Sequence, residues 1–417
     1  MSRPHPILLA IARGESVETI SDPDRLFDSA VEHRMTGLLW STLRTRPDLG
    51  PSRWRQMVAS HDLLQRRRHA ASWRALEDLT DLARDLDLHI ATVKGVTAEA
   101  RWYGRMGERP SRDIDLVLHP ADLCRAEELV QAIQPNHPLI GKIQTLVDER
   151  VLQSVELRFA DRFAVDLHFD LLKLGMPSPD PDSIWTHMVP YRSPNGTELL
   201  VPDPELALLH FLIHLTKDRF RYLLGYVDVR RLIEAEVVDW DAFQALGRRQ
   251  GLDRHLWLAL RAVVTVVPLQ QTPTPSVPMT PATLIWRILW RPNIRLRGEE
   301  GSVRFRHRQD WLALTTRGHA VRAARYWLRR RLLPPRELIA YRHPDSDRYW
   351  WNVTLGRLTA ARRRRRASDM LPQHGSERQE NVETPSVADW PLLLPPSNRA
   401  CREPDWKLKE TNPEGPE

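Results

Sequence analysis

Two aspartates one residue apart, Asp113 and Asp115, have the types and the spacing that most directly indicate chemistry in this chain. Side chains alternate between the two faces of a β-strand, so a strand over 113–118 would place both carboxylates on one face and Ile114 and Leu116 on the other. Two carboxylates this close repel each other unless a cation lies between them. Mg²⁺ prefers oxygen ligands and usually keeps substrate phosphates among them. The pair therefore predicts a platform for a metal–nucleotide complex, although an ordinary surface strand also carries paired acids.

A strand, a turn and a helix are expected just before this pair. Residues 88–93 are rich in apolar and β-branched side chains, which predicts a short strand. Gly95 permits a tight turn and a close approach of the backbone to a ligand. A helix over 96–103 would then direct free backbone amides at a phosphate, with Lys94 at the mouth of the turn. The alternative is an ordinary strand–turn–helix with a solvated lysine.

A hairpin is expected after the pair, with strands over 154–159 and 163–169 and a turn at 160–162. The second strand would place Asp166, His168 and Asp170 on one face, and thus supply a third carboxylate beside the first strand. Three carboxylates from two strands suit a phosphoryl transfer that uses two metal ions. The third acid could also serve as a general base.

Three motifs of this stretch resemble the nucleotidyltransferases related to DNA polymerase β, and more closely their poorly characterised bacterial branch. The motifs are a Lys-Gly turn, an Arg-Pro-x-x-Asp-Ile-Asp-Leu strand and an Asp-Leu-His strand, here at 94–95, 109–116 and 166–168. The resemblance implies an α+β fold, with a polymerase β-like nucleotidyltransferase core of a small mixed sheet with helices. It also implies that this core is flanked by N-terminal and C-terminal helical regions.

The resemblance further implies roles for individual residues. Asp113, Asp115 and Asp166 would be catalytic and would bind two Mg²⁺ ions, with Mn²⁺ as an alternative. Lys94 and the Gly95 turn would meet the triphosphate, and His168 would support the acids or be structural. One departure concerns the turn, since Val96 follows the glycine where the superfamily usually has serine, and the nearest hydroxyl is that of Thr97.

A helix expected from 205 to 218 carries a further phosphate candidate. Asp203 and Pro204 have the types of an N-cap and a first-turn residue. His210, His214 and Lys217 fall on one helical face. By resemblance, Lys217 would contact nucleotide phosphate; the alternative is that the histidines pack and cap within a helical bundle.

A chain of 417 residues is expected to contain more than one compact unit. The pattern predicts six regions: helices over 1–87, the α/β nucleotidyltransferase core over 88–200, a helical region packing on it over 201–269, a Pro/Thr linker over 270–281, a basic Trp/Arg-rich helical region over 282–366 and a disordered tail over 367–417. The two cysteines, Cys124 and Cys401, indicate no disulfide framework. No apolar run reaches the length of a membrane span, so a cytoplasmic location is expected.

The positive charge is concentrated in one segment. Residues 287–366 contain 22 arginines, no lysine and six acidic residues, which gives a net charge of +16, against +7 for the whole chain. Interleaved arginines and tryptophans can stack bases and bind phosphates, which predicts contact with RNA or another polyanion. The alternative is that the tryptophans are the core face of helices and the arginines a solvated face.

The function expected from these residues is a Mg²⁺-dependent nucleotidyltransferase. It would transfer a nucleoside monophosphate from ATP or another nucleoside triphosphate to a hydroxyl of an unknown acceptor, and release pyrophosphate. The acceptor could be a small molecule, a protein or RNA, because a fold does not name a substrate. The alternative from another class is a non-catalytic RNA-binding or regulatory protein that retains the fold.

Overall fold

The computed structural model describes residues 4–148, 152–160, 163–172, 178–218 and 220–269. The predicted linker, the basic region with its polyanion-contact segment 287–366, and the tail lie outside these residues. Among the described residues, no helix combines the length and the apolar composition that crossing a bilayer requires.

Four helices form the N-terminal part, as the sequence predicts. They are α1 (Pro6–Arg13), α2 (Pro23–Glu32), α3 (Thr36–Thr45) and α4 (Ser52–Asp85). The longest of them, α4, is a single helix of 34 residues. No glycine or proline interrupts this stretch, so nothing in the backbone chemistry ends the helix before Asp85.

A small mixed sheet follows, and the α+β fold class is confirmed. Its four strands lie in the order β1-β2-β4-β3. They are β1 (Ile90–Thr92), β2 (Asp113–Leu118), β3 (Ser154–Phe159) and β4 (Phe163–His168). The hairpin of β3 and β4 is antiparallel, as predicted, and β4 runs parallel to β2. Because β4 ends at His168, Asp170 lies beyond the strand and does not share its face with Asp166, contrary to the sequence expectation; its carboxylate instead accepts from the backbone N–H groups of Leu172 and Ser178.

Helices and a second, two-stranded sheet complete the described chain. Within the four-stranded part of the chain lie α5 (Val96–Trp102), η1 (Pro120–Arg125), α6 (Ala126–Ile133) and α7 (Ile143–Asp148). After β4 come α8 (Pro181–Trp185) and the two strands of the second sheet, β5 (Met188–Arg192) and β6 (Glu198–Pro202). The last described helices are α9 (Pro204–Lys217), α10 (Leu223–Ala235), α11 (Trp240–Arg249) and α12 (Asp253–Val266). Residues 120–133 form two consecutive helices, η1 and α6. The start of α9 is as predicted, because the side chain of Asp203 accepts from the backbone N–H of Leu206.

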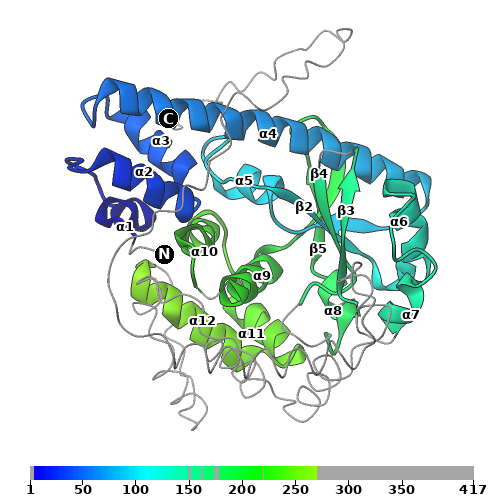
Figure 1. The fold of residues 1–417 in the computed structure, drawn as a ribbon. Coiled ribbons are helices and arrows are strands. Elements are labelled where there is room, and N and C mark those ends of the chain that lie inside the picture. The colour runs from blue at the N-terminus through cyan, green and yellow to red at the C-terminus, as the bar shows by residue number, and fades with distance from the viewer. Residues whose placement is uncertain (1–3, 149–151, 161–162, 173–177, 219, 270–417) are drawn as a thin grey trace, which may run out of the picture.

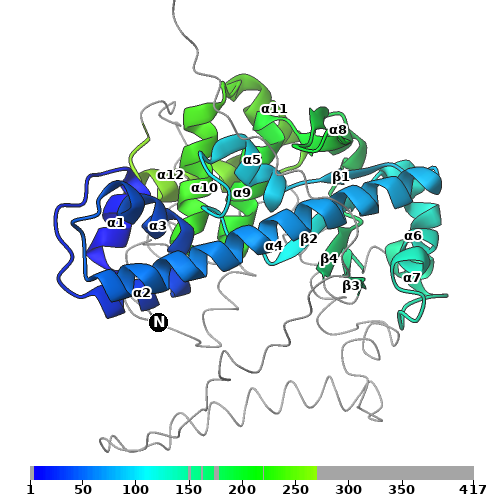
Figure 2. The same cartoon turned by 90° about the horizontal axis from the view of Figure 1, so that it is seen from above.

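Two hydrophobic clusters hold these elements together, and α4 contributes to both. One cluster combines α1–α3 with α9–α12 and takes Trp54 and Val58 from the first half of α4. The other surrounds the four-stranded sheet and takes Trp73 and Leu76 from the second half. Figures 1 and 2 show α4 extending from the N-terminal helices to the sheet and α6. The first three helices therefore pack with the helices that follow the sheet in sequence.

Candidate active site

The pairing of β2 with β4 brings the predicted acids together. Asp115 lies directly beside Asp166 in the parallel register, and Asp113 lies beside Ala164. Since side chains alternate along a strand, Asp113 and Asp115 share a face, and that face also carries Asp166 of the neighbouring strand. The alternate positions of β2, Ile114 and Leu116, lie in the hydrophobic cluster around the sheet.

His168 connects two of the three carboxylates. Its Nε2 atom lies 3.3 Å from Oδ1 of Asp115 and 3.3 Å from Oδ2 of Asp166. One ligand atom from each of these three residues lies within 4.8 Å of the others. The other oxygen of Asp115, Oδ2, is buried and has no hydrogen-bond partner among the described residues. An unpaired buried carboxylate oxygen is costly, and it is a ligand of the type that a hard divalent cation takes. The donor set thus fits a divalent metal ion.

Lys94, in addition to His168, lies beside the carboxylate of Asp115 and balances its charge. Its Nζ atom lies 2.9 Å from Oδ1 of Asp115 and 3.0 Å from Nε2 of His214. Burial alone would lower the pKa of Lys94, but the carboxylates of Asp115 and Asp113 outweigh burial and raise it. Burial would raise the pKa of Asp115, but Lys94 and His168 hold that pKa well below its ordinary value. The two groups therefore form a buried ion pair at the end of β2.

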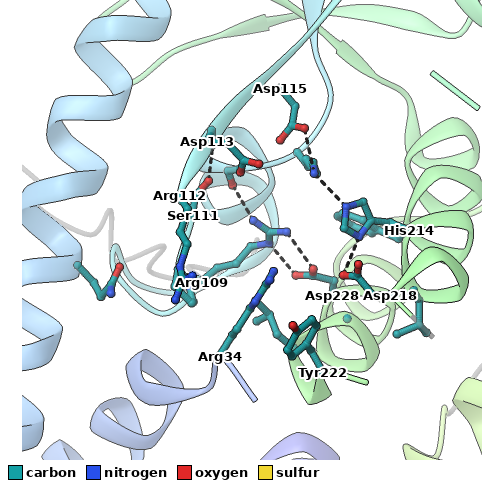
Figure 3. A pocket seen from close by; sticks show the side chains of 18 of the residues that line it. Arg34, Arg109, Ser111, Arg112, Asp113, Asp115, His214, Asp218, Tyr222 and Asp228 are labelled. Carbon is teal, nitrogen blue, oxygen red and sulfur yellow. Dashed lines mark hydrogen bonds and ion pairs between the residues drawn. The ribbon is translucent and has the colours of Figure 1, made fainter. Parts of the chain in front are cut away.

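His214 and Asp218 fix the position of Lys94. The Nδ1 atom of His214 lies 3.2 Å from Oδ2 of Asp218, which leaves Nε2 to accept from Lys94. Burial and the nearby Lys94 lower the pKa of His214, in keeping with a neutral ring. His210, one turn earlier on α9, is also buried, and burial holds its pKa well below the ordinary value. Asp115, His214 and Asp218, the members of this chain of contacts that are labelled, are seen together in Figure 3.

The turn after β1 has the backbone geometry that glycine permits. Gly95 has φ 70° and ψ −129°, and a Cβ atom placed there would lie 3.1 Å from Oγ of Ser111. The Thr97 hydroxyl donates to the backbone oxygen of Lys94 at 2.9 Å, so it stabilises the turn. Lys217 is exposed. Neither Thr97 nor Lys217 is among the residues that line the pocket described next, and as nucleotide contacts both remain sequence predictions.

A pocket of about 240 Å³ opens in front of Asp113 and Asp115. Its walls include Lys94 and Gly95 from the turn, and they extend to α4, to α9 and α10, and to the end of α2. Asp166 and His168 stand beside Asp115 but are not among the lining residues. The pocket is therefore built jointly by the sheet and by the helices on both sides of it in sequence.

A second buried ion pair, between Arg109 and Asp228, forms one wall of the pocket (Figure 3). The Nε and Nη2 atoms of Arg109 donate to the two carboxylate oxygens of Asp228 at 2.8 and 3.0 Å. The Tyr103 hydroxyl donates to the same carboxylate at 2.6 Å. Burial would lower the pKa of Arg109, but the negative charge of Asp228 outweighs burial and raises this pKa. Arg109 also donates to the backbone oxygen of Gly95 at 3.3 Å, so the pair ties α10 to the turn.

Several pocket residues carried no role in the sequence interpretation. Arg34 and Tyr222 come from segments far from the motifs, and the partner of Arg109 lies 119 residues away. Arg109 itself stood within the Arg-Pro motif, and that motif was the one local signal that could have drawn attention to it. Nothing in the sequence near Arg34 indicated that it would face the same pocket.

Comparisons with known proteins give one family match over most of the described residues. A family model described as "uncharacterised nucleotidyltransferase" matches residues 20–268, which is more than half of the chain. None of the curated proteins compared with the chain matches it. Among solved structures, the chain is similar to an antigenic nucleotidyltransferase-like protein from Paracoccidioides brasiliensis, with 18% identity over 46% of this chain and 87% of that chain. The TM-score of 0.28 is too low to transfer the role of any residue.

Proposed function

Because the chain belongs to the family of uncharacterised nucleotidyltransferases, we propose that it transfers a nucleoside monophosphate from a nucleoside triphosphate to a hydroxyl of an acceptor, in a Mg²⁺-dependent reaction. The observation that best supports this proposal is the register that sets Asp115 beside Asp166, with one oxygen of Asp115 buried and unpartnered among the described residues. We further propose a cytoplasmic location, where nucleoside triphosphates are available.

In this proposal, Asp113, Asp115 and Asp166 hold Mg²⁺, with Mn²⁺ as a substitute. Bound divalent ions neutralise phosphate charge and lower the pKa of an attacking hydroxyl. Other residues of the chain would position the substrate and the metal-binding carboxylates. Lys94 and the Gly95 turn contact the phosphates, and His168 keeps the carboxylates of Asp115 and Asp166 in place.

The reaction exchanges one bond to phosphorus for another. The acceptor oxygen forms a bond to the α-phosphorus while the bond from that phosphorus to the bridging oxygen of the β-phosphate breaks. The acceptor proton passes to Asp166, and pyrophosphate leaves with the electron pair of the broken bond. Asp166 is proposed for this role because it is half-buried directly beside Asp115, which lines the pocket. Catalysis of this kind depends mostly on positioning and on compensation of charge.

The test is nucleotide binding by titration calorimetry with ATP, GTP, CTP and UTP, each with and without Mg²⁺. We expect Mg²⁺-dependent binding of at least one nucleotide to the wild type and its loss in Asp113→Asn/Asp115→Asn. The matched control is Asp78→Asn, an exposed aspartate on α4 outside the pocket, which should bind as the wild type does. Equal Mg²⁺-dependent binding by the double variant would contradict the site assignment.

A turnover assay tests whether the protein transfers the nucleoside monophosphate and releases pyrophosphate. A nucleoside triphosphate labelled at the α-phosphate is incubated with a cell extract that has been separated into small molecules, proteins and RNA. The reaction should release pyrophosphate and transfer the label to an acceptor in one of these fractions. The double variant should label none of these. Labelling that persists in the double variant would show that other residues carry the reaction.

A further inference from the structure

Two arginines of the pocket differ from its other cations in how their charge is balanced. Lys94 and Arg109 each face a carboxylate at ion-pair distance, Asp115 and Asp228 respectively. Arg34 and Arg112 also line the pocket, but within the described part of the chain neither guanidinium has a carboxylate partner at that distance. The carboxylates of Asp113 and Asp218 also line the pocket, but among the described residues neither lies at ion-pair distance from Arg34 or Arg112, so both guanidiniums can bind an incoming anion.

The end of helix α2 sets the backbone of Arg34. Arg34 follows the C-cap residue His33 and has φ 60°, and the N–H groups of Arg34 and Met35 donate to the backbone oxygens of Val31 and Ala30, as is common where a helix ends in a left-handed residue. Its neighbours His33 and Met35 are buried, and the backbone oxygen of His33 accepts from the N–H of Leu224 at the start of α10. The segment is therefore anchored on both sides of Arg34.

Tyr222 orients the guanidinium of Arg34. The Cζ atom of Arg34 lies 4.1 Å from the centre of the Tyr222 ring. Figure 3 shows both side chains in the same part of the pocket as Arg109 and Asp228. Stacking uses the flat face of a guanidinium and leaves its N–H groups, which lie in the plane, free to bind a phosphate with two hydrogen bonds. The arrangement is therefore suited to an anion with several oxygens.

We infer that Arg34 and Arg112 bind the terminal phosphates of the nucleotide, so that the segment after α2 completes the triphosphate site from outside the α/β core. This inference rests on the proposed function. The β- and γ-phosphates are the most highly charged part of the substrate, and they become the leaving group. Arg112 precedes Asp113 directly in the chain, which places one of the two arginines next to the acids that would hold the metal.

The test compares ligands that differ only in their phosphates. The nucleoside triphosphate, the corresponding monophosphate and inorganic tripolyphosphate are titrated with Mg²⁺ into the wild type and into the Arg34→Gln, Arg34→Lys and Arg112→Gln variants. Since hydrogen bonds to charged groups each contribute about 1.5–3 kcal/mol, each Gln variant should weaken triphosphate and tripolyphosphate binding by about 10- to 100-fold, with Arg34→Lys in between. Monophosphate binding should change by less than about twofold. Arg53→Gln, at an exposed position in the first turn of α4, is the matched control and should bind all three ligands as the wild type does.

The outcomes separate this inference from the proposed function. An equal loss of monophosphate and triphosphate binding would place the arginines on another part of the substrate, such as the acceptor, and overturn the inference. Unchanged triphosphate binding in the Gln variants would overturn it as well. If the wild type binds no nucleotide, the proposed function fails, and the titration with tripolyphosphate then tests the inference by itself. Tripolyphosphate binding that depends on Arg34 would support a polyphosphate site at these arginines. No tripolyphosphate binding would overturn the inference. Thermal unfolding of each variant, with Arg34→Lys as the conservative change, separates loss of the site from loss of the fold.

Discussion

The buried pair of Arg109 and Asp228 gives a prediction whose size follows from the structure. Three hydrogen bonds converge on the Asp228 carboxylate: two come from Arg109 and one from Tyr103. Asp228→Asn keeps the shape of the side chain but removes its charge and turns one acceptor oxygen into a donor. Arg109 and Asp228 are only 7% and 4% exposed, so few water molecules can reach Arg109 to replace the lost charge and the lost hydrogen bond. Removal of one partner of a buried ion pair costs about 3–5 kcal/mol.

We therefore expect Asp228→Asn to lower the free energy of unfolding by about 3 kcal/mol, the lower end of that range, because the amide oxygen still accepts one hydrogen bond. The measurement is urea unfolding at pH 7, with Asp78→Asn as the exposed control, which should change stability by less than about 0.5 kcal/mol. Arg109→Met/Asp228→Asn should be less destabilised than the sum of its two single changes, since it contains no unpaired buried charge. A loss below about 1 kcal/mol for Asp228→Asn, or strict additivity in the double variant, would refute the reasoning.

Three other changes test separate parts of the fold. Gly95→Ala should destabilise the protein by about 1–3 kcal/mol and weaken nucleotide binding, because φ at this position is 70° and the new Cβ would crowd Ser111; urea unfolding and titration calorimetry measure the two effects. Asp203→Ala should cost at least about 1 kcal/mol of stability, because it removes the α9 N-cap and the 2.6 Å contact of Oδ2 with Nδ1 of His187; Asp203→Asn should retain the cap, and thermal unfolding measures both changes. Burial lowers the pKa of His33, so the unfolded chain takes up a proton before the folded one as the pH falls below 6.5, and stability must fall with it. His33→Leu should make the loss of stability between pH 7.5 and 5.5 smaller than in the wild type, and an unchanged loss would contradict this.

Local patterns were enough to place the acids. Alternation along 113–118 predicted the strand and its two faces, and the hairpin pattern predicted the strand that carries Asp166. The cap of α9 by Asp203 was also readable, since capping depends on residues a few positions apart. These features rest on short-range rules, which a single sequence contains in full.

The remainder of the pocket depends on contacts between distant segments. No short-range rule relates Arg109 to Asp228, or Lys94 to His214 120 residues later, and the position of Arg34 depends on how α2 packs beside α10. The sequence predicted a third carboxylate beside the first strand, but it did not show the parallel register of β4 with β2 that sets Asp166 directly against Asp115. Lys217 was selected for its spacing from the histidines, but helical spacing alone did not show that its side chain would be exposed.

The 34-residue helix α4 has a consequence for how this protein loses its structure. A helix of this length extends about 50 Å, and its two halves are buried in different hydrophobic clusters. Neither cluster can open fully without exposing one half of α4, and the backbone hydrogen bonds of an uninterrupted helix couple the two halves. The slowest-exchanging amides around the sheet and around the terminal helices should therefore share one opening free energy. A fragment that begins after α4 would expose apolar surface in both clusters, so the strands that carry the three aspartates and the first four helices are expected to fold as one cooperative unit.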